Sequence, residues 1–161
     1  MKKILVVYHS RTGFTSTVAR QIANACNADL ESVKDIRRHC DRKTYIRLAL
    51  EAAIHSDTVI RRVIHAPEDY DIVVIGTPIW CWNIASPVRA YIINHRHQLK
   101  RVAFFCTYGG SGHVKVMHDL EHLTGQTPMA TLTLKDDDIK GDRYHILVSE
   151  FITILSHVIH P

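Results

Sequence analysis

Three uninterrupted apolar runs constrain this chain more than any other feature. They lie within residues 4–8, 71–76 and 102–106, and each is followed by a polar or glycine-bearing segment. An apolar run of this length indicates a strand buried on both faces, as in a parallel sheet covered by helices. The sequence therefore predicts a parallel sheet at the centre of the fold.

Helical patterns separate these runs. Apolar residues recur at helical spacing in residues 14–25, 87–95, 114–123 and 144–158, with Asp142 as a candidate cap of the last helix. Weaker patterns predict strands at 28–33 and 130–134 and a helix at 44–54, inside the basic and least readable region 34–66. Alternation of strands and helices predicts an α/β fold with helices on both faces of the sheet.

Composition favours one ordinary globular domain over residues 1–161. The 161-residue chain has no repeat or Gly/Ser linker, and no apolar run approaches the roughly 18 residues that span a bilayer. Its four cysteines form no Cys-x-x-Cys pair, and Ser10 interrupts the first apolar run too early for a signal peptide. We therefore expect a cytoplasmic chain with reduced thiols and no membrane span.

The loop after the first strand has the character of an anion site. His9-Ser10-Arg11-Thr12-Gly13-Phe14-Thr15 joins a strand end to a helix N-terminus, where free backbone N–H groups favour negative charge. Hydroxyls and a glycine add donors and a tight turn. The loop is not a Walker motif. An ordinary strand–helix turn with a hydroxyl cap is the alternative.

Two further loops follow the other clear strands. Residues 77–83 carry both tryptophans of the chain, and residues 107–112 carry Tyr108 and three glycines. In a doubly wound sheet, ligands bind beyond the carboxyl ends of the strands, where these loops meet. Together they suggest a flat aromatic ligand, with Tyr108 as a second stacking face. The alternatives are a core tryptophan and a flexible turn.

These three loops resemble those of the flavodoxin-like family of FMN-binding proteins. Ser10-Arg11-Thr12-Gly13-Phe14-Thr15 is similar to the family's phosphate loop, and the segments 76–80 and 108–110 are similar to its two ring-binding loops. The resemblance implies a doubly wound, five-stranded parallel sheet in the order 2-1-3-4-5. It also implies FMN and a redox role.

The resemblance assigns cofactor contacts by position. Around the phosphate it places Ser10, Arg11, Thr12, Gly13, Phe14 and Thr15. On one side of the ring it places Pro78, Ile79, Trp80, Trp82 and Asn83. On the other side, and at the pyrimidine edge, it places Thr107, Tyr108, Gly109, Gly110 and Gly112. No catalytic acid or base is assigned, because the ring itself supplies the electron chemistry.

Two departures bear on the type of redox protein. Electron-carrying flavodoxins are strongly acidic, whereas this chain has a formal net charge of +4. They also commonly carry a glycine in the ring loop, whose peptide turns over on reduction, and no glycine lies between Thr77 and Ser86. We therefore favour a two-electron reductase acting on a quinone-like or similar acceptor. The alternatives are a non-enzymatic carrier between protein partners and a regulatory domain that has lost flavin.

Other residues and partners are less constrained. His118 and His122 have metal-compatible spacing but read as a chance pair, and Cys81 reads as a small buried residue rather than a redox thiol. The basic stretch 95–101 reads as a solvated face that could also dock an acidic partner. The resemblance implies an electron donor, which we expect to be NAD(P)H or a reductase, and an acceptor that is a small molecule or a protein. We expect no nucleic-acid partner and leave a homodimer open.

Overall fold

A parallel sheet organises the chain, which the computed structural model describes over residues 2–36 and 58–159. The parallel strands are β1 (Ile4–Tyr8), β2 (Asp29–Ser32), β3 (Ile72–Trp80), β5 (Val102–Tyr108) and β6 (Thr131–Lys135). They lie in the order β2-β1-β3-β5-β6, while the short β4 (Asn83–Ile84) pairs antiparallel with β3. Counted without β4, this is the order 2-1-3-4-5, so the predicted fold is confirmed.

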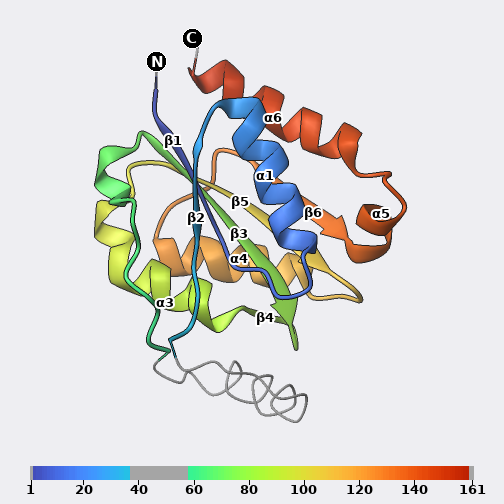
Figure 1. Cartoon of the computed structure of the whole chain (residues 1–161), viewed down its shortest axis with the longest axis horizontal. Helices are drawn as coiled ribbons and strands as arrows, with labels where there is room; N and C mark the ends of the chain where they lie inside the picture. The colour runs from blue at the N-terminus through green and yellow to red at the C-terminus, as the bar shows by residue number, and fades with distance from the viewer. Residues whose placement is uncertain (1, 37–57, 160–161) are drawn as a thin grey trace.

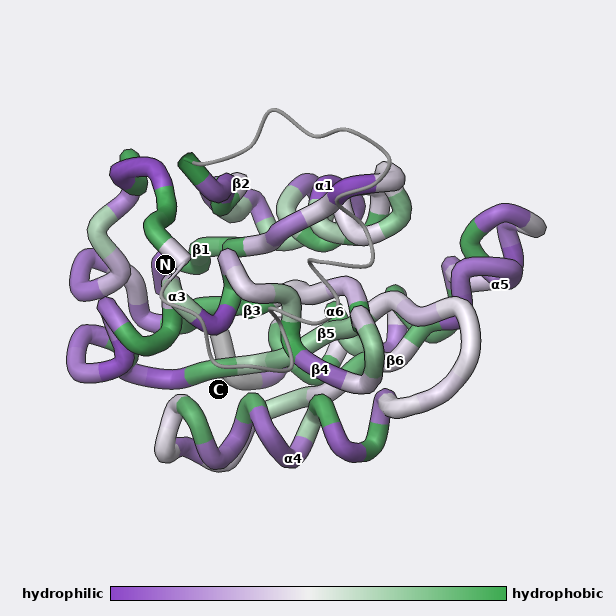
Figure 2. Tube along the Cα trace, turned by 90° about the horizontal axis from the view of Figure 1, so that it is seen from below, coloured by the Kyte–Doolittle hydropathy of each residue, from purple (hydrophilic) through white to green (hydrophobic). Residues whose placement is uncertain are grey.

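Helices cover both faces of the sheet (Figure 1). The helices are α1 (Phe14–Cys26), α3 (Ser86–His95), α4 (His113–Thr124), α5 (Asp136–Lys140) and α6 (His145–Ile159), with 3₁₀ turns at Pro67–Asp69 and Arg96–Gln98. The pair α1 and α6 packs on one face and the pair α3 and α4 on the other. Figure 2 shows mixed apolar and polar positions along α4, as expected of a helix with one buried face. No helix in the described part of the chain has the length and apolar character needed to cross a bilayer.

The alternation of side chains along β1 builds two cores. Ile4, Val6 and Tyr8 belong to the core beneath α1 and α6. Leu5 and Val7 belong to the core beneath α3 and α4. Because successive strand residues point to opposite faces, an apolar run is required wherever both faces are covered. This is the physical reason for the runs in the sequence.

The structure extends or corrects several sequence predictions. Strand β3 continues to Trp80, where a loop was predicted after residue 76, because β4 returns beside it as a hairpin. Asp142 is not the cap of α6: its backbone has φ 57°, and it lies three positions before the first helical residue, His145. Helix α5 was not predicted. The predicted helix at 44–54 lies outside the described residues.

The segment that precedes β3 is clamped to β2. The carboxylate of the buried Glu31 accepts hydrogen bonds from the backbone N–H groups of Ile64 and His65, each 3.0 Å away, and contacts His65 Nδ1 at 2.8 Å. Tyr70 donates to Asp29 at 2.7 Å. These contacts fix the entry to β3, and therefore the register in which its loop reaches the end of the sheet.

Candidate functional site

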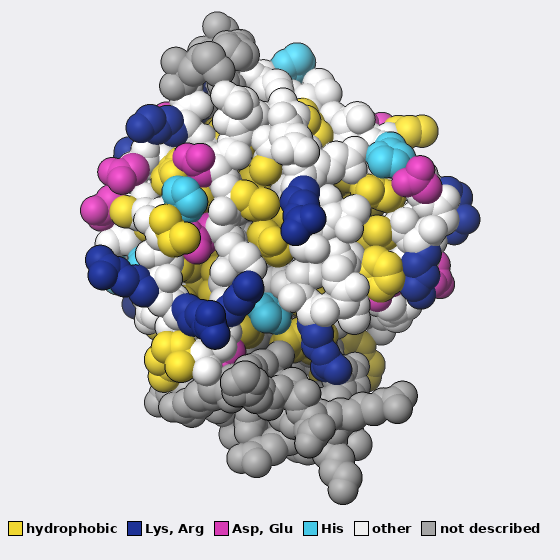
Figure 3. All heavy atoms as spheres, in the orientation of Figure 1, with side chains coloured by type: hydrophobic (Ala, Val, Ile, Leu, Met, Phe, Trp, Pro, Cys, Tyr) yellow, Lys and Arg dark blue, Asp and Glu magenta, His cyan; other side chains and the backbone are white. Residues whose placement is uncertain are grey.

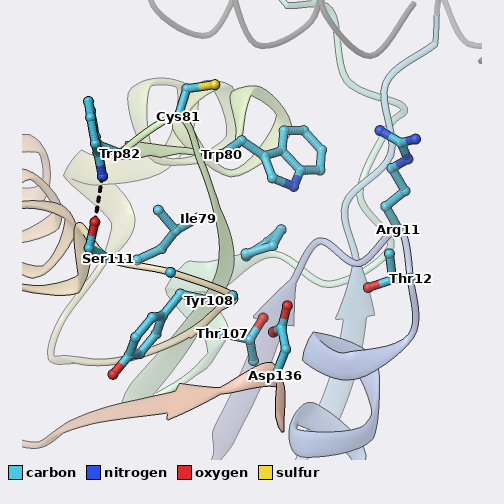
Figure 4. A pocket seen from close by; sticks show the side chains of 13 residues that line it. Arg11, Thr12, Ile79, Trp80, Cys81, Trp82, Thr107, Tyr108, Ser111 and Asp136 are labelled. Carbon is cyan, nitrogen blue, oxygen red and sulfur yellow. Dashed lines mark hydrogen bonds between the residues drawn. The ribbon is translucent and has the colours of Figure 1, made fainter. Parts of the chain in front are cut away.

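A cavity of about 370 Å³ opens at the carboxyl ends of β1, β3 and β5. Its walls come from all three loops singled out in the sequence and from the start of α5 (Figure 4). It is lined by Arg11, Thr12, Pro78, Ile79, Trp80, Cys81, Trp82, Thr107, Tyr108, Gly109, Gly110, Ser111 and Asp136. Small-molecule sites measure roughly 300–1,000 Å³, so this cavity is large enough for one such ligand.

The loop between β1 and α1 presents an uncapped helix N-terminus. Gly13 precedes the helix with φ 103°, in the left-handed region that only glycine adopts readily, and no side chain caps the first turn. The Ser10 hydroxyl oxygen instead accepts a hydrogen bond from the backbone N–H of Gly13 at 3.2 Å. A Cβ at Gly13 would meet no atom within 4 Å. The helix end is therefore open to a negatively charged group.

Thr15 ties this loop to the centre of the sheet. Its hydroxyl lies 2.8 Å from that of Thr107, and both residues are buried, with 2% of their surfaces exposed. The hydrogen bond joins the start of α1 to the end of β5. It therefore fixes the distance between the helix N-terminus and the glycine-rich loop that follows Tyr108.

The β3–β4 hairpin carries both tryptophans. Its two turn residues, Cys81 and Trp82, have φ 46° and 59°, as in a type I′ turn, although neither is a glycine or an asparagine. The Asn83 side chain braces this turn by donating to the Cys81 carbonyl at 2.9 Å. Below the turn, the Trp80 indole meets the His9 ring edge to face, with centroids 5.3 Å apart.

The loop between β5 and α4 closes against this hairpin. Trp82 donates from Nε1 to the Ser111 hydroxyl at 2.8 Å (Figure 4). A Cβ at Gly112 would come within 2.4 Å of the Trp82 side chain, so the close approach requires glycine there. The Tyr108 ring stacks on His113 at a centroid distance of 4.6 Å and points away from Arg11 and Thr12, which leaves mainly its backbone at the cavity.

Asp136 is a site residue that the sequence analysis missed. It begins α5 directly after β6, and its carboxylate faces the space beside Thr107 in Figure 4. Partial burial raises the pKa of this carboxyl, the nearby Lys140 opposes the rise, and Asp137 adds to it. The signal was its position at the carboxyl end of a parallel strand, the same edge that places the other loops.

The structure divides the predicted site residues into two groups. The cavity lining includes Arg11, Thr12, Pro78, Ile79, Trp80, Trp82, Thr107, Tyr108, Gly109 and Gly110. The remainder shape the loops from outside the lining: Ser10, Gly13, Phe14, Thr15, Asn83 and Gly112. Besides Asp136, the cavity adds Cys81 and Ser111.

Three further observations concern the cysteines, metal ligands and surface charge. Cys81 is exposed rather than buried, because it occupies the tip of the hairpin, whereas burial raises the pKa of the Cys106 thiol on β5 to about 12. Among residues 2–36 and 58–159, no three His, Cys, Asp or Glu side chains are grouped to hold a metal ion. Cationic and anionic side chains are interspersed on the face drawn in Figure 3.

Comparison with known proteins agrees with the fold. Residues 3–140 match the sequence model of the flavodoxin family. The chain therefore belongs to the flavodoxin family, and the predicted resemblance is confirmed. No curated protein matches it by sequence.

Solved structures of the same architecture include several flavoproteins. A Lactobacillus acidophilus flavoprotein in complex with FMN superposes with a TM-score of 0.71 and 23% identity, over 90% of this chain and 99% of that one. An NADH:FMN oxidoreductase in its apo form superposes with a TM-score of 0.60 and 15% identity, over 98% of this chain and 88% of that one. Two-electron reduced Megasphaera elsdenii flavodoxin superposes with a TM-score of 0.51 and 23% identity, over 81% of this chain and 85% of that one.

Proposed function

We propose that this chain is a single-domain flavoprotein that binds FMN in the cavity at the ends of β1, β3 and β5. The observation that carries the proposal is that one cavity joins Arg11 and Thr12, in the loop that leads into the uncapped N-terminus of α1, to the indole of Trp80. A phosphate monoester requires free N–H donors at the first, and a flat ring requires an aromatic wall at the second. The solved complex of a similar fold with FMN adds support.

Each loop has a separate part in this proposal. Residues 10–15 hold the phosphate through backbone N–H groups and hydroxyls, with Arg11 supplying positive charge. Trp80, Ile79 and Pro78 provide one apolar wall, and the backbone of residues 107–110 provides the opposite edge. FMN, when bound, supplies the transfer of one or two electrons. The hydrogen bond from Trp82 to Ser111 links the two ring-side loops.

We further propose that the protein acts as a two-electron reductase rather than as a carrier. The net charge of +4 differs from the strongly acidic character of electron-carrying flavodoxins, whose negative charge steers them to their protein partners. The turn at Cys81 and Trp82 already has positive φ at both positions, and Asn83 holds the Cys81 carbonyl. A peptide held in this way resists rotation on reduction. NAD(P)H or a reductase would supply electrons in the cytoplasm, and a quinone-like molecule would accept them.

Titration with FMN and with riboflavin tests the cofactor assignment. We expect FMN to bind at micromolar concentrations and to quench tryptophan emission, and riboflavin, which lacks the phosphate, to bind more weakly. Thr12→Asp places a carboxylate in the loop and should weaken FMN by at least tenfold while affecting riboflavin little. Thr131→Asp, exposed at the start of β6 and outside the cavity lining, is the matched control. Equal affinity for both flavins in the parent protein would overturn the phosphate assignment.

Enzyme assays separate the reductase from the carrier. We expect the FMN-loaded protein to oxidise NADPH or NADH with a quinone acceptor and no added reductase. In a reductive titration, the half-reduced flavin should stay a minor species. Activity only after adding a reductase and a protein acceptor, with abundant half-reduced flavin, would favour the carrier.

A further inference from the structure

A second pocket lies on the other side of the β3–β4 hairpin. It has a volume of about 240 Å³ and is lined by Asn83, Arg89, Lys115, Asp119, His122 and Leu123. These residues come from β4, α3 and α4, so the pocket lies where the two helices of one sheet face meet the hairpin. None of them lines the larger cavity.

Arg89 is the unusual member of this pocket. It is half-buried, and its Nε is fully enclosed without a hydrogen-bond partner among the described residues. No ion pair to its guanidinium occurs within residues 2–36 and 58–159 either. A guanidinium is always charged, and enclosing one of its N–H groups without an acceptor costs free energy. The arrangement is explained if an acceptor enters the pocket from outside.

The neighbouring charges leave room for an anion. Lys115 is held beside the pocket by Asp119 at 2.5 Å and by the Asn83 side-chain oxygen at 3.3 Å. This contact offsets the charge of Asp119, so the pocket carries one excess positive charge from Arg89. The imidazole of His122 adds a further N–H donor. Lys115 is 56% exposed and can turn its ammonium group toward a ligand without unfolding any backbone.

We propose that this pocket is a second anion site, which takes the phosphate group of a small phosphorylated ligand. A guanidinium offers paired N–H donors that match two oxygens of a phosphate, and a concave pocket suits a compact anion better than a flat protein partner. The site is separate from the proposed flavin cavity and does not depend on it. The two share only the hairpin, in which Asn83 pairs with Trp80.

Amide chemical shifts of the full-length, isotopically labelled protein test the proposal at constant ionic strength. The probes are inorganic phosphate, adenosine 2′-monophosphate and acetate. We expect saturable shifts at Asn83, Lys115 and His122 with both phosphates and none with acetate. Tighter binding of the nucleotide would identify a phosphorylated nucleoside as the source of the anion, and equal binding would identify the free anion; either result supports the site.

Substitutions test whether the chemical-shift changes arise from an anion bound beside Arg89. Arg89→Gln should weaken phosphate binding at this pocket at least tenfold, whereas Arg96→Gln, on the exposed 3₁₀ turn, should leave it unchanged. If Arg89→Gln fails to fold, Lys115→Gln at the exposed rim should still weaken binding severalfold. Absence of saturable shifts at these amides, equal shifts with acetate, or shifts that neither Arg89→Gln nor Lys115→Gln diminishes would overturn the proposal. Because flavin absorbance is not the readout, this outcome is distinct from any failure of FMN binding.

Discussion

Gly76 makes a sharp test of how the sheet positions the cavity. It lies on β3 directly opposite Phe105 on β5, and the Phe105 ring occupies the space that a side chain at Gly76 would need. A Cβ there would lie 2.0 Å from Phe105 Cζ and 2.3 Å from Cε1. Phe105 is fully buried in the core beneath α1 and α6, so the ring has no solvent to move into.

The cost of Gly76→Ala follows from this geometry. Carbon atoms pack at about 3.5–4.0 Å, so the ring would have to retreat by about 1.5 Å into a close-packed core. Such overpacking costs about 1–3 kcal/mol. Alanine is less flexible than glycine in the unfolded chain, and this difference stabilises the folded state by about 0.4–1 kcal/mol. We expect a net loss of about 1–2 kcal/mol in the free energy of unfolding.

Urea denaturation of the apoprotein measures this loss. Gly110→Ala is the matched control, because a Cβ there meets no atom within 4 Å, and it should change stability by less than about 0.5 kcal/mol. Phe105→Leu alone should destabilise by leaving a cavity, but should cost less in the Gly76→Ala background, with a coupling of about 1 kcal/mol or more. Additive effects, or a Gly76→Ala variant as stable as the parent, would refute the reasoning.

Three further substitutions probe the loops around the cavity. Thr15→Val leaves the buried Thr107 hydroxyl without its partner at 2.8 Å, and should lower the urea-derived stability by about 1–3 kcal/mol; no loss would contradict the link. Cys81→Gly removes the strain of a positive φ of 46° and should stabilise the fold by about 1 kcal/mol, seen as a higher thermal midpoint; an unchanged midpoint would show that the turn is unstrained. Burial raises the pKa of the Asp136 carboxyl in the folded protein above its ordinary value of 3.8, so the folded state holds this proton more tightly than the unfolded state. The free energy of unfolding of the parent should therefore decline as the pH rises from 3.8 through the raised pKa. Asp136→Asn should remove that decline, and parallel pH profiles for the two proteins would show that the carboxyl is not responsible.

The sheet could be predicted because burial on both faces leaves a direct mark in the sequence. The apolar runs at residues 4–8 and 102–106, flanked by helical patterns, are typical of strands buried on both faces. The β3–β4 hairpin left no such mark. Its turn has no Asn-Gly or Gly pair, and β4 spans only Asn83–Ile84, so its formation depends on tertiary contacts such as that of Trp82 with Ser111.

The candidate site was predictable where loops follow strongly marked strands. Asp136 was missed because β6 is short and only alternately buried, so the loop after it did not stand out. Arg89 was missed for a different reason. One arginine within an apolar helix gives no sign of whether its charge has a partner, and only the packing of α3 against α4 and β4 decides that.

The placement of the tryptophans gives the molecule a built-in optical reporter. Both indoles of the chain lie in one hairpin, where Trp80 contacts the His9 ring and Trp82 donates a hydrogen bond to Ser111. All indole emission therefore originates at the rim of one cavity. A fluorescence trace recorded during denaturation follows the opening of this hairpin, and only far-ultraviolet circular dichroism follows the loss of the helices on the two faces.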